Sequence, residues 1–310
     1  MPVQIGFFGA GQAARRHAET LSRLDAEIVA VCDIAAPRAE TFAADFGATV
    51  YSSPNRMLNG ENLDALYICT PPNVRGPVEI AAAKAGVALF IETPVALNLA
   101  TAQSVLNAIN RFGVPCSVGS YWRYFESTER LRKQIAPKNA PKPQIISGNW
   151  LETAPATAWR ENDKLSGGIW LDGAYQLLDL ARIFGGEVAK VSALSAPESK
   201  TAIVQFQSGA RGAFNAGRFL ESGSEREFSL ATPEAIHLLR EGTLETRRGD
   251  ETSLFRGADD AILAQNVAFL RAIETGKRTE VRATYADAIK TLRLGLALNR
   301  AGLGSKIVSL

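Results

Sequence analysis

The hydrophobic positions of the first 120 residues fall into short runs separated by amphipathic stretches. Apolar runs at 3–8, 27–32, 65–69, 88–91 and 114–118 predict buried strands. Helical periodicity at 12–24, 37–46, 75–85 and 99–112 predicts helices between them. Strands and helices that alternate in this way are typical of a parallel sheet covered by helices. We therefore expect a doubly wound α/β domain over residues 1–122.

A proline-rich segment at 136–143 interrupts both periodicities and predicts a surface connection near the domain boundary. Beyond it, one helix is predicted at 168–184, and two late helices at 259–275 and 283–300. Alternating strands are predicted at 144–152, 187–194, 201–207, 210–218, 225–231, 235–239 and 243–247. This pattern favours a second α/β domain, residues 123–310, with an open, mainly antiparallel sheet. Its last helices are free to pack back on the first domain.

The first strand runs into a glycine turn, Gly9-Ala10-Gly11-Gln12-Ala13-Ala14, which matches G-x-G-x-x-A. Gly9 permits the tight turn, and Gly11 lets a pyrophosphate approach the backbone. Ala14 lets the following helix pack closely on the strand. The turn therefore predicts a dinucleotide site.

Two further features support this site. The free amides at the helix start, among them those of Gln12 and Ala13, would hold the phosphates at the positive end of the helix dipole. Asp33 follows the next strand, about twenty residues beyond the turn, where an acidic side chain accepts from ribose hydroxyls and repels a 2′-phosphate. We expect NAD(H) rather than NADP(H).

Side chains that follow strand ends are the other candidates, because ligands bind at the carboxyl edge of an open parallel sheet. Asp33, Thr70, Glu92 and Gly119 each occupy such a position.

Composition adds mainly exclusions. The 310 residues suit two domains, and 46% hydrophobic with 21% charged residues describes an ordinary globular protein. A net charge of +2 gives no electrostatic reason to expect a nucleic-acid or membrane partner. No export leader or membrane-spanning run is evident, so we expect a cytoplasmic protein.

Cysteine and histidine usage argues against a metal. Cys32, Cys69 and Cys116 are scattered in strand-like runs, which predicts buried free thiols. The chain has 2 histidines, too few for a histidine-rich site. We expect His17 to be a packing or capping residue and His237 a surface or interface residue.

The helix predicted at 168–184 carries a polar stripe on a mostly apolar cylinder. Its members are Asp172, Tyr175, Gln176 and Asp179. Such a stripe either faces solvent or lines a cavity, and the preceding Gly167-Gly168 favours the cavity. Asp172 also suits a first helical turn whatever its function, Asp179 suits a structural role, and Tyr175 suits a core position with a satisfied hydroxyl.

With these motifs in this order, the chain resembles the Gfo/Idh/MocA family of NAD(P)-dependent oxidoreductases. The resemblance implies a Rossmann domain and an open-sheet domain used for homodimer or homotetramer contacts. It also implies that nicotinamide and a small substrate, often a sugar or polyol, meet between the domains. The positions that carry it are Gly9 to Ala14, Asp33, Thr70-Pro71-Pro72, Glu92-Thr93-Pro94, Arg123, Trp159-Arg160, Ser166-Gly167-Gly168, Asp172 and Asp179. Pro71, Glu92 and Arg160 join the cofactor site on this basis.

Three positions depart from the family pattern. The usual lysine of E-K-P is Thr93, the usual histidine of the helix motif is Gln176, and the histidine after T-P-P is Arg75. Neither Thr93 nor Gln176 titrates near neutral pH, so neither is an ordinary general acid or base. The candidate catalytic positions are Asp172, Tyr175, Gln176, Thr93 and Tyr121.

The expected function is therefore hydride transfer without the usual proton relay. Arg75 and Arg123 would hold an anionic substrate through forked hydrogen bonds. Reduction of a C=N or C=C bond would dispense with lysine and histidine; the bilin reductases of the superfamily also lack that lysine. A cofactor-binding member without turnover, a sensor or partner protein, is the alternative.

Overall fold

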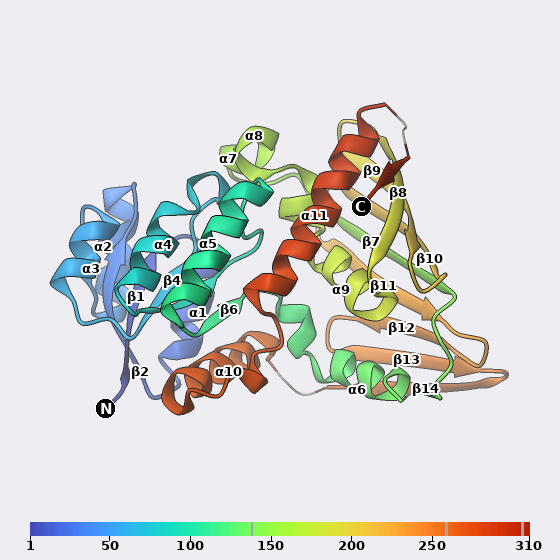
Figure 1. Cartoon of the computed structure of the whole chain (residues 1–310), viewed down its shortest axis with the longest axis horizontal. Coiled ribbons are helices and arrows are strands. Elements are labelled where there is room, and N and C mark those ends of the chain that lie inside the picture. The colour runs from blue at the N-terminus through green and yellow to red at the C-terminus, as the bar shows by residue number, and fades with distance from the viewer. Residues whose placement is uncertain (138, 258–259, 305–306) are drawn as a thin grey trace. The chain divides into compact units, whose positions relative to one another are not determined.

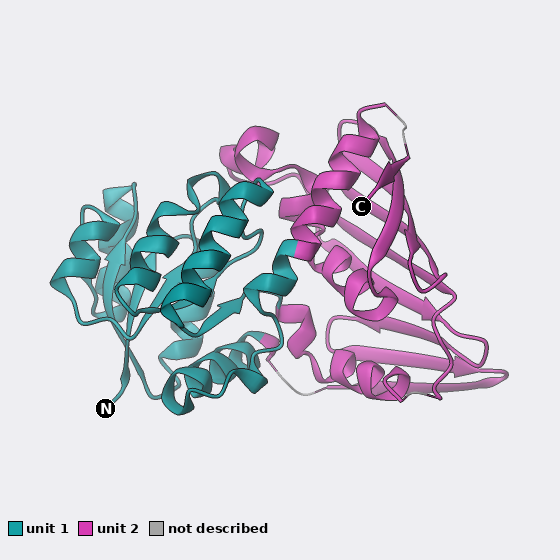
Figure 2. Cartoon of the chain, in the orientation of Figure 1, with its two compact units in different colours: residues 1–120, 262–289 teal, residues 121–261, 290–310 magenta. Residues whose placement is uncertain are grey.

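The computed structural model describes residues 1–310 except 138, 258–259 and 305–306. The chain divides into two compact units (Figure 2). Unit 1 comprises residues 1–120 and 262–289, and unit 2 comprises 121–261 and 290–310.

Unit 1 is built on a parallel sheet of six strands in the order β3-β2-β1-β4-β5-β6 (Figure 1). The central strands are fully apolar and buried, which is typical of a sheet covered on both faces. Their bounds are β1 Val3–Phe8, β2 Ala26–Cys32, β3 Thr49–Val50, β4 Ala65–Ile68, β5 Ala88–Ile91 and β6 Cys116–Val118. The doubly wound parallel sheet predicted from the sequence is confirmed.

The helices of this unit are α1 Gln12–Leu21, α2 Ala36–Phe46, α3 Pro54–Gly60, α4 Pro77–Lys84, α5 Leu99–Phe112 and α10 Ala261–Thr275. Apolar faces of α1, α2 and α10 share one core with the strands. Phe269 of α10 stacks edge-on against Tyr67 of β4 and Phe90 of β5. A segment from late in the chain therefore completes the core of the first sheet.

Helix α4 begins two residues later than predicted. Residues Pro72–Val74 form a 3-10 turn, and Gly76 takes a φ of +117° that a side chain would disfavour. The buried Glu79 carboxylate then accepts from the Gly76 amide at 2.7 Å, which caps the helix.

Unit 2 contains a sheet of nine strands in the order β14-β13-β12-β11-β7-β10-β9-β8-β15. Neighbours are antiparallel except β7 and β10, which run parallel. The bounds are β7 Ile145–Thr153, β8 Val188–Ser195, β9 Ser199–Phe206, β10 Arg211–Leu220, β11 Ser224–Ala231, β12 Ile236–Arg240, β13 Thr243–Arg248, β14 Glu251–Arg256 and β15 Val308–Ser309. The mainly antiparallel sheet is confirmed. Strands β14 and β15 were not predicted from the sequence.

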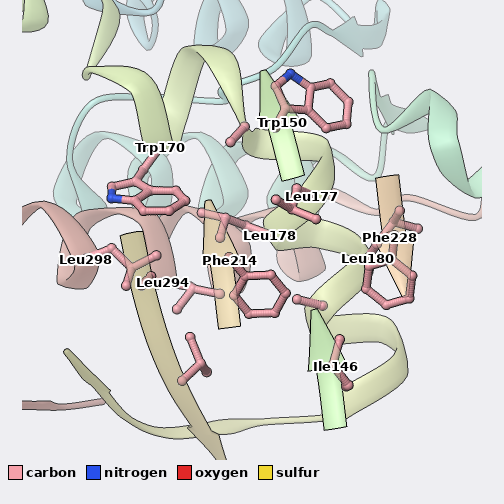
Figure 3. Packing of buried hydrophobic residues seen from close by; sticks show 14 of the residues in the cluster. Ile146, Trp150, Trp170, Leu177, Leu178, Leu180, Phe214, Phe228, Leu294 and Leu298 are labelled. Atoms are coloured by element: carbon pink, nitrogen blue, oxygen red, sulfur yellow. The ribbon is translucent and has the colours of Figure 1, made fainter. Parts of the chain in front are cut away.

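The core of this unit forms between the sheet and two helices, α9 Tyr175–Gly185 and α11 Tyr285–Gly302. Figure 3 shows Leu177, Leu178 and Trp170 packed with Phe214 of β10 and with Leu294 of α11. Shorter helices are α6 Glu126–Ile135, α7 Ala158–Glu161 and α8 Asp163–Ser166.

Two sequence predictions are corrected in unit 2. The helix expected at 168–184 is a π-helical turn, Ile169–Gly173, followed by α9, because the Ala174 amide bonds the Ile169 carbonyl five residues back at 2.8 Å. His237, expected at the surface or in an interface, is buried within unit 2 and bonds the Thr246 hydroxyl at 3.0 Å. None of the described helices has the length and apolar character needed to cross a bilayer.

Candidate active site

The glycine turn after β1 is shaped by close backbone contact. Gly9 has a φ of +97°, and a Cβ there would lie 2.8 Å from the carbonyl carbon and oxygen of Cys69. Only glycine fits this position without strain. At Gly11, by contrast, a Cβ would meet nothing within 4 Å. The backbone at Gly11 therefore borders open space, as the approach of a pyrophosphate requires.

Donors gather around this opening. Helix α1 begins with Gly11 as its N-cap, and its first intrahelical bond runs from the Arg15 amide to the Gly11 carbonyl at 3.0 Å. The amides of Gln12 and Ala13 precede that bond, so no carbonyl within the helix satisfies them. The buried Thr70 hydroxyl at the end of β4 also has no partner among the described residues. These features fit the phosphates of a dinucleotide.

Asp33 at the end of β2 is held in place by the backbone. One carboxylate oxygen accepts from the Ala10 amide at 2.8 Å, and the other accepts from the Ala35 amide at 2.8 Å. Each oxygen keeps a further lone pair for a ribose hydroxyl. The next residue, Ile34, is a fully exposed apolar side chain at the same strand end. Asp33 is thus both a brace of the glycine turn and a candidate ribose acceptor.

Arg75 is occupied by main-chain oxygens. Its guanidinium donates to the Thr70 carbonyl at 2.6 Å and to the Glu92 carbonyl at 2.8 Å, and the residue is buried. It therefore ties the segments that follow β4 and β5 to each other, including Pro71. This geometry favours a positioning role, and anion binding by Arg75 stays a prediction.

Glu92 and Thr93 follow β5. The Glu92 carboxylate accepts from the Thr93 amide at 3.1 Å and lies 2.9 Å from the Nε2 atom of His17. The Nδ1 atom of His17 in turn lies 2.9 Å from the Asn266 amide oxygen. The sequence predicts a packing or capping role for His17 and gives no sign of Asn266. Asn266 lies 249 positions from His17, so no local motif could have found it.

In unit 2, Arg160 and Asp172 meet directly. The Asp172 carboxylate accepts from the Arg160 guanidinium at 2.7 Å and also from that of Arg218 in β10. Both arginines contact the Glu152 carboxylate of β7, at 3.2 and 3.0 Å. Two predicted site residues thus share one charge cluster, although Arg160 had been expected at the cofactor and Asp172 in catalysis.

Arg123 and Asp179 form a buried ion pair. The Arg123 guanidinium donates two parallel hydrogen bonds to the Asp179 carboxylate, at 2.6 and 2.5 Å. The Thr291 hydroxyl donates to the same carboxylate at 3.0 Å. This network matches the structural role expected of Asp179, and it occupies the fork of Arg123 that was expected to hold substrate.

The remaining polar residues of this region are also enclosed. Burial, followed by the charge of Asp179, raises the pKa of the Tyr175 hydroxyl far above its usual value, which disfavours proton release there. The Gln176 side-chain oxygen accepts from the Trp122 amide at 3.5 Å. Tyr121, in the 3-10 turn Tyr121–Tyr124, is half-buried and packs against Phe125. Catalytic roles for these residues stay predictions.

Among the described residues, no group of three or more histidine, cysteine, aspartate or glutamate side chains could hold a metal ion. The three cysteines are free thiols. Burial raises the pKa of each thiol, most strongly at Cys69 and Cys116, so thiolate chemistry is disfavoured.

A Rossmann sheet, a glycine turn open to a pyrophosphate and a carboxylate at the end of β2 are the features of a dinucleotide-binding protein. Residues 3–120 match the model of the oxidoreductase family with an NAD-binding Rossmann fold, and residues 128–235 match the GFO/IDH/MocA C-terminal domain. The chain belongs to the Gfo/Idh/MocA family of oxidoreductases.

Two curated relatives cover 96% and 70% of the chain. A myo-inositol 2-dehydrogenase of Thermotoga maritima is 26% identical over 96% of both chains. A scyllo-inositol 2-dehydrogenase (NAD(+)) of Bacillus subtilis is 29% identical over 70% of this chain and 67% of its own. A levoglucosan dehydrogenase solved with NADH and levoglucosan has the same fold, with a TM-score of 0.91 at 17% identity, covering 100% of this chain and 99% of its own.

Proposed function

We propose that the chain is an NAD-dependent dehydrogenase that interconverts a secondary hydroxyl and a ketone on a sugar or polyol. The observation that carries this proposal is the intact dinucleotide framework, Gly9, Gly11 and Asp33, in a chain related over its whole length to an inositol dehydrogenase. The relatives named above act on sugars and polyols, which favours this chemistry over reduction of a C=N or C=C bond.

The preference for NAD over NADP rests on Asp33. Its carboxylate is fixed by two backbone amides, and a fixed negative charge would repel a 2′-phosphate. Arg38 lies nearby, 3.5 Å from Asp33, but its charge is partly balanced by that same carboxylate. NADH is therefore the expected partner, and removal of the Asp33 charge would leave Arg38 free for a phosphate.

The residues of this chain divide the work. The cofactor supplies the hydride acceptor. The α1 amides and Asp33 bind it, and Arg75 holds the segments after β4 and β5 in register for it. The hydroxyl proton of the substrate needs a separate acceptor, because Thr93 and Gln176 do not titrate near neutral pH.

The test is NADH formation from NAD with inositols, hexoses and sugar acids, alongside NADH oxidation with an imine and an enone. Turnover with a hydroxyl compound supports the proposal. Turnover restricted to the imine or enone, or none at all despite NADH binding, contradicts it. A gain of turnover only in the Thr93→Lys, Gln176→His double variant would favour the alternative of a cofactor-binding member that has lost catalysis.

We further propose that the open face of the unit 2 sheet is the homo-oligomer contact. Strand register places five half-exposed apolar residues on one face: Ile145, Leu194, Ile203, Ile236 and Leu254. Apolar side chains exposed on one sheet face are a feature of surfaces that meet a partner. Light scattering should find a dimer or tetramer, and Ile203→Lys should shift it toward monomer. A wild-type monomer at all concentrations contradicts this assignment.

A further inference from the structure

His17 is a buried imidazole whose two ring nitrogens both face oxygen. The ring lies edge-on to Phe90 at 4.6 Å and is 1% exposed. Its Nε2 atom faces the Glu92 carboxylate at 2.9 Å, and its Nδ1 atom faces the Asn266 amide oxygen at 2.9 Å. A ring nitrogen that faces an acceptor must carry a hydrogen. With the Asn266 amide oxygen turned toward the ring, both nitrogens meet that condition, and this arrangement corresponds to an imidazolium paired with a carboxylate.

Glu92 connects this buried ring to the sheet edge. One carboxylate oxygen bonds His17, while the other accepts from the Thr93 amide. This second oxygen occupies the space that a Cβ atom at Gly119 would need. The Glu92 side chain is 18% exposed against 1% for His17. Among the described contacts of His17, the Glu92 carboxyl can take a proton from the ring, and it lies beside Thr93, the position of the missing family lysine.

The charged and titratable neighbours favour ionisation of this carboxyl. Burial raises the pKa of Glu92, but the hydrogen bond and charge of His17 lower it, as do the charge of Arg16 and the Thr93 amide, and the net pKa lies below the usual value. Cys69 is a buried neutral thiol, Tyr67 donates its hydroxyl to Asn266, and Arg75 donates to the Glu92 main-chain carbonyl. None of these neighbours competes for the proton between His17 and Glu92.

We propose that His17 and Glu92 form the proton store for hydride transfer, in place of the lysine and histidine that this chain lacks. This proposal rests on the proposed dehydrogenase function. In the direction of reduction, the ketone gains a hydride and its oxygen takes a proton from Glu92. The Nε2 proton of His17 moves to Glu92 in the same step and leaves a neutral imidazole. In oxidation the hydroxyl proton follows the reverse path onto a neutral His17.

The protonation state is measurable without any substrate, because the chain has 2 histidines. Long-range ¹H–¹⁵N spectra of histidine-labelled protein will show two imidazole patterns, and His237→Gln assigns the remaining one to His17. We expect both His17 nitrogens to carry a hydrogen in the wild type, and Glu92→Gln to leave a neutral ring. The matched control is Glu61→Gln, a glutamate of the same unit that bonds the Tyr51 hydroxyl, which should leave the His17 pattern unchanged. A neutral His17 in the wild type, with Asn266 turned to present its amide nitrogen, overturns the proposal.

Kinetics test whether this proton is used. With a ketone that the wild type reduces, His17→Gln should lower kcat by about 100-fold, the scale of one general acid. It should also flatten the fall of reductive kcat with rising pH, while NADH affinity measured by fluorescence stays within about threefold, under 1 kcal/mol. An unchanged pH profile overturns the proposal. Failure of every ketone and alcohol with the wild type would refute the dehydrogenase function itself, whereas the imidazole spectra would still report the pair.

Discussion

The two units differ in how their candidate site residues are bonded. At the sheet edge of unit 1, groups are left open: Gly11 borders empty space, the Thr70 hydroxyl has no partner among the described residues, and Ile34 is fully exposed. In unit 2, the polar stripe is closed on itself, since Asp179 is paired with Arg123 and Asp172 with two arginines. Buried polar groups without partners are costly, so the open edge suits the ligand that we propose, and the ion pairs of the stripe suit a structural role.

This difference changes how the family resemblance transfers to this chain. The turn at Gly9 and the Asp33 carboxylate have the geometry that the proposed cofactor site requires. The polar residues from Asp172 to Asp179 stand at the positions of the family's helix motif. However, both carboxylates are paired with arginines, and Gln176 stands where the family usually has a histidine. Our proposal places the proton chemistry in unit 1, at His17 and Glu92.

The largest expected effect comes from removing one partner of the buried Arg123–Asp179 ion pair in unit 2. Asp179→Asn leaves the buried Arg123 guanidinium facing a neutral amide, and loss of one partner of a buried pair costs about 3–5 kcal/mol. Urea unfolding should show this loss, while NADH affinity stays unchanged. The exposed i,i+3 pair Arg132–Glu129 is the matched control, because Arg132→Met should cost no more than about 1 kcal/mol. Equal effects of the two variants would mean that the buried pair is not structural.

The next prediction concerns unit 1, where a side chain at Gly11 would fill the space beside the glycine turn. Gly11→Leu adds a side chain where nothing lies within 4 Å, so the fold should tolerate it while the pyrophosphate is blocked. We expect NADH to bind about 100-fold more weakly, a loss of about 2.7 kcal/mol, with the melting temperature little changed. Gly9→Ala is the counterpart, since its Cβ would collide with Cys69 and should destabilise the protein. Undiminished NADH binding by Gly11→Leu would place the cofactor elsewhere.

A smaller change sharpens the cofactor assignment. Asp33→Ser removes the charge that repels a 2′-phosphate and leaves Arg38 unpaired. The ratio of NADH to NADPH affinity should fall about tenfold, which is 1.4 kcal/mol. Fluorescence titration with both cofactors measures it. A preference for NADPH already in the wild type would contradict the role given to Asp33.

The smallest effect is on acid stability. Burial lowers the pKa of His237 below its usual value of 6.5, so the unfolded chain takes up this proton first. The free energy of unfolding should therefore fall, by about 1 kcal/mol or less, as pH drops through 6.5. Glu92 also has a lowered pKa, and its contribution is lost in a more acidic window, below its usual 4.5. His237→Gln should remove the first step alone; persistence of that step assigns it to another group.

The sequence predicted the fold well where periodicity is strong. Apolar runs placed β1, β2, β4 and β5 within two residues, because fully buried strands have an unmistakable pattern. The polar strand β14 and the π-helical turn at Ile169–Gly173 escaped prediction. Both depend on particular backbone hydrogen bonds. Strand β14 forms by pairing with β13, and the π-helical turn forms because the Ala174 amide bonds the carbonyl five residues back instead of four.

Site residues that form a local motif were predicted, and contacts between distant residues were not. Gly9, Gly11 and Asp33 are local motifs whose meaning is fixed by backbone geometry. Arg218, which bonds both Asp172 and Glu152, comes from the distant strand β10, and Asn266, which faces His17, comes from α10. No spacing in the chain could have predicted these contacts.

The central claim is hydride transfer between NAD and a ring or chain hydroxyl carbon, supported by the open edge of unit 1. Its most direct test incubates the wild-type protein and NAD with polyols and sugars deuterated at their hydroxyl-bearing carbons, followed by mass spectrometry of the nicotinamide product. The account predicts reduced cofactor that carries one deuterium, formed by the wild type and lost in Gly11→Leu. Tight NADH binding with no deuterium transferred from any hydroxyl compound would contradict it.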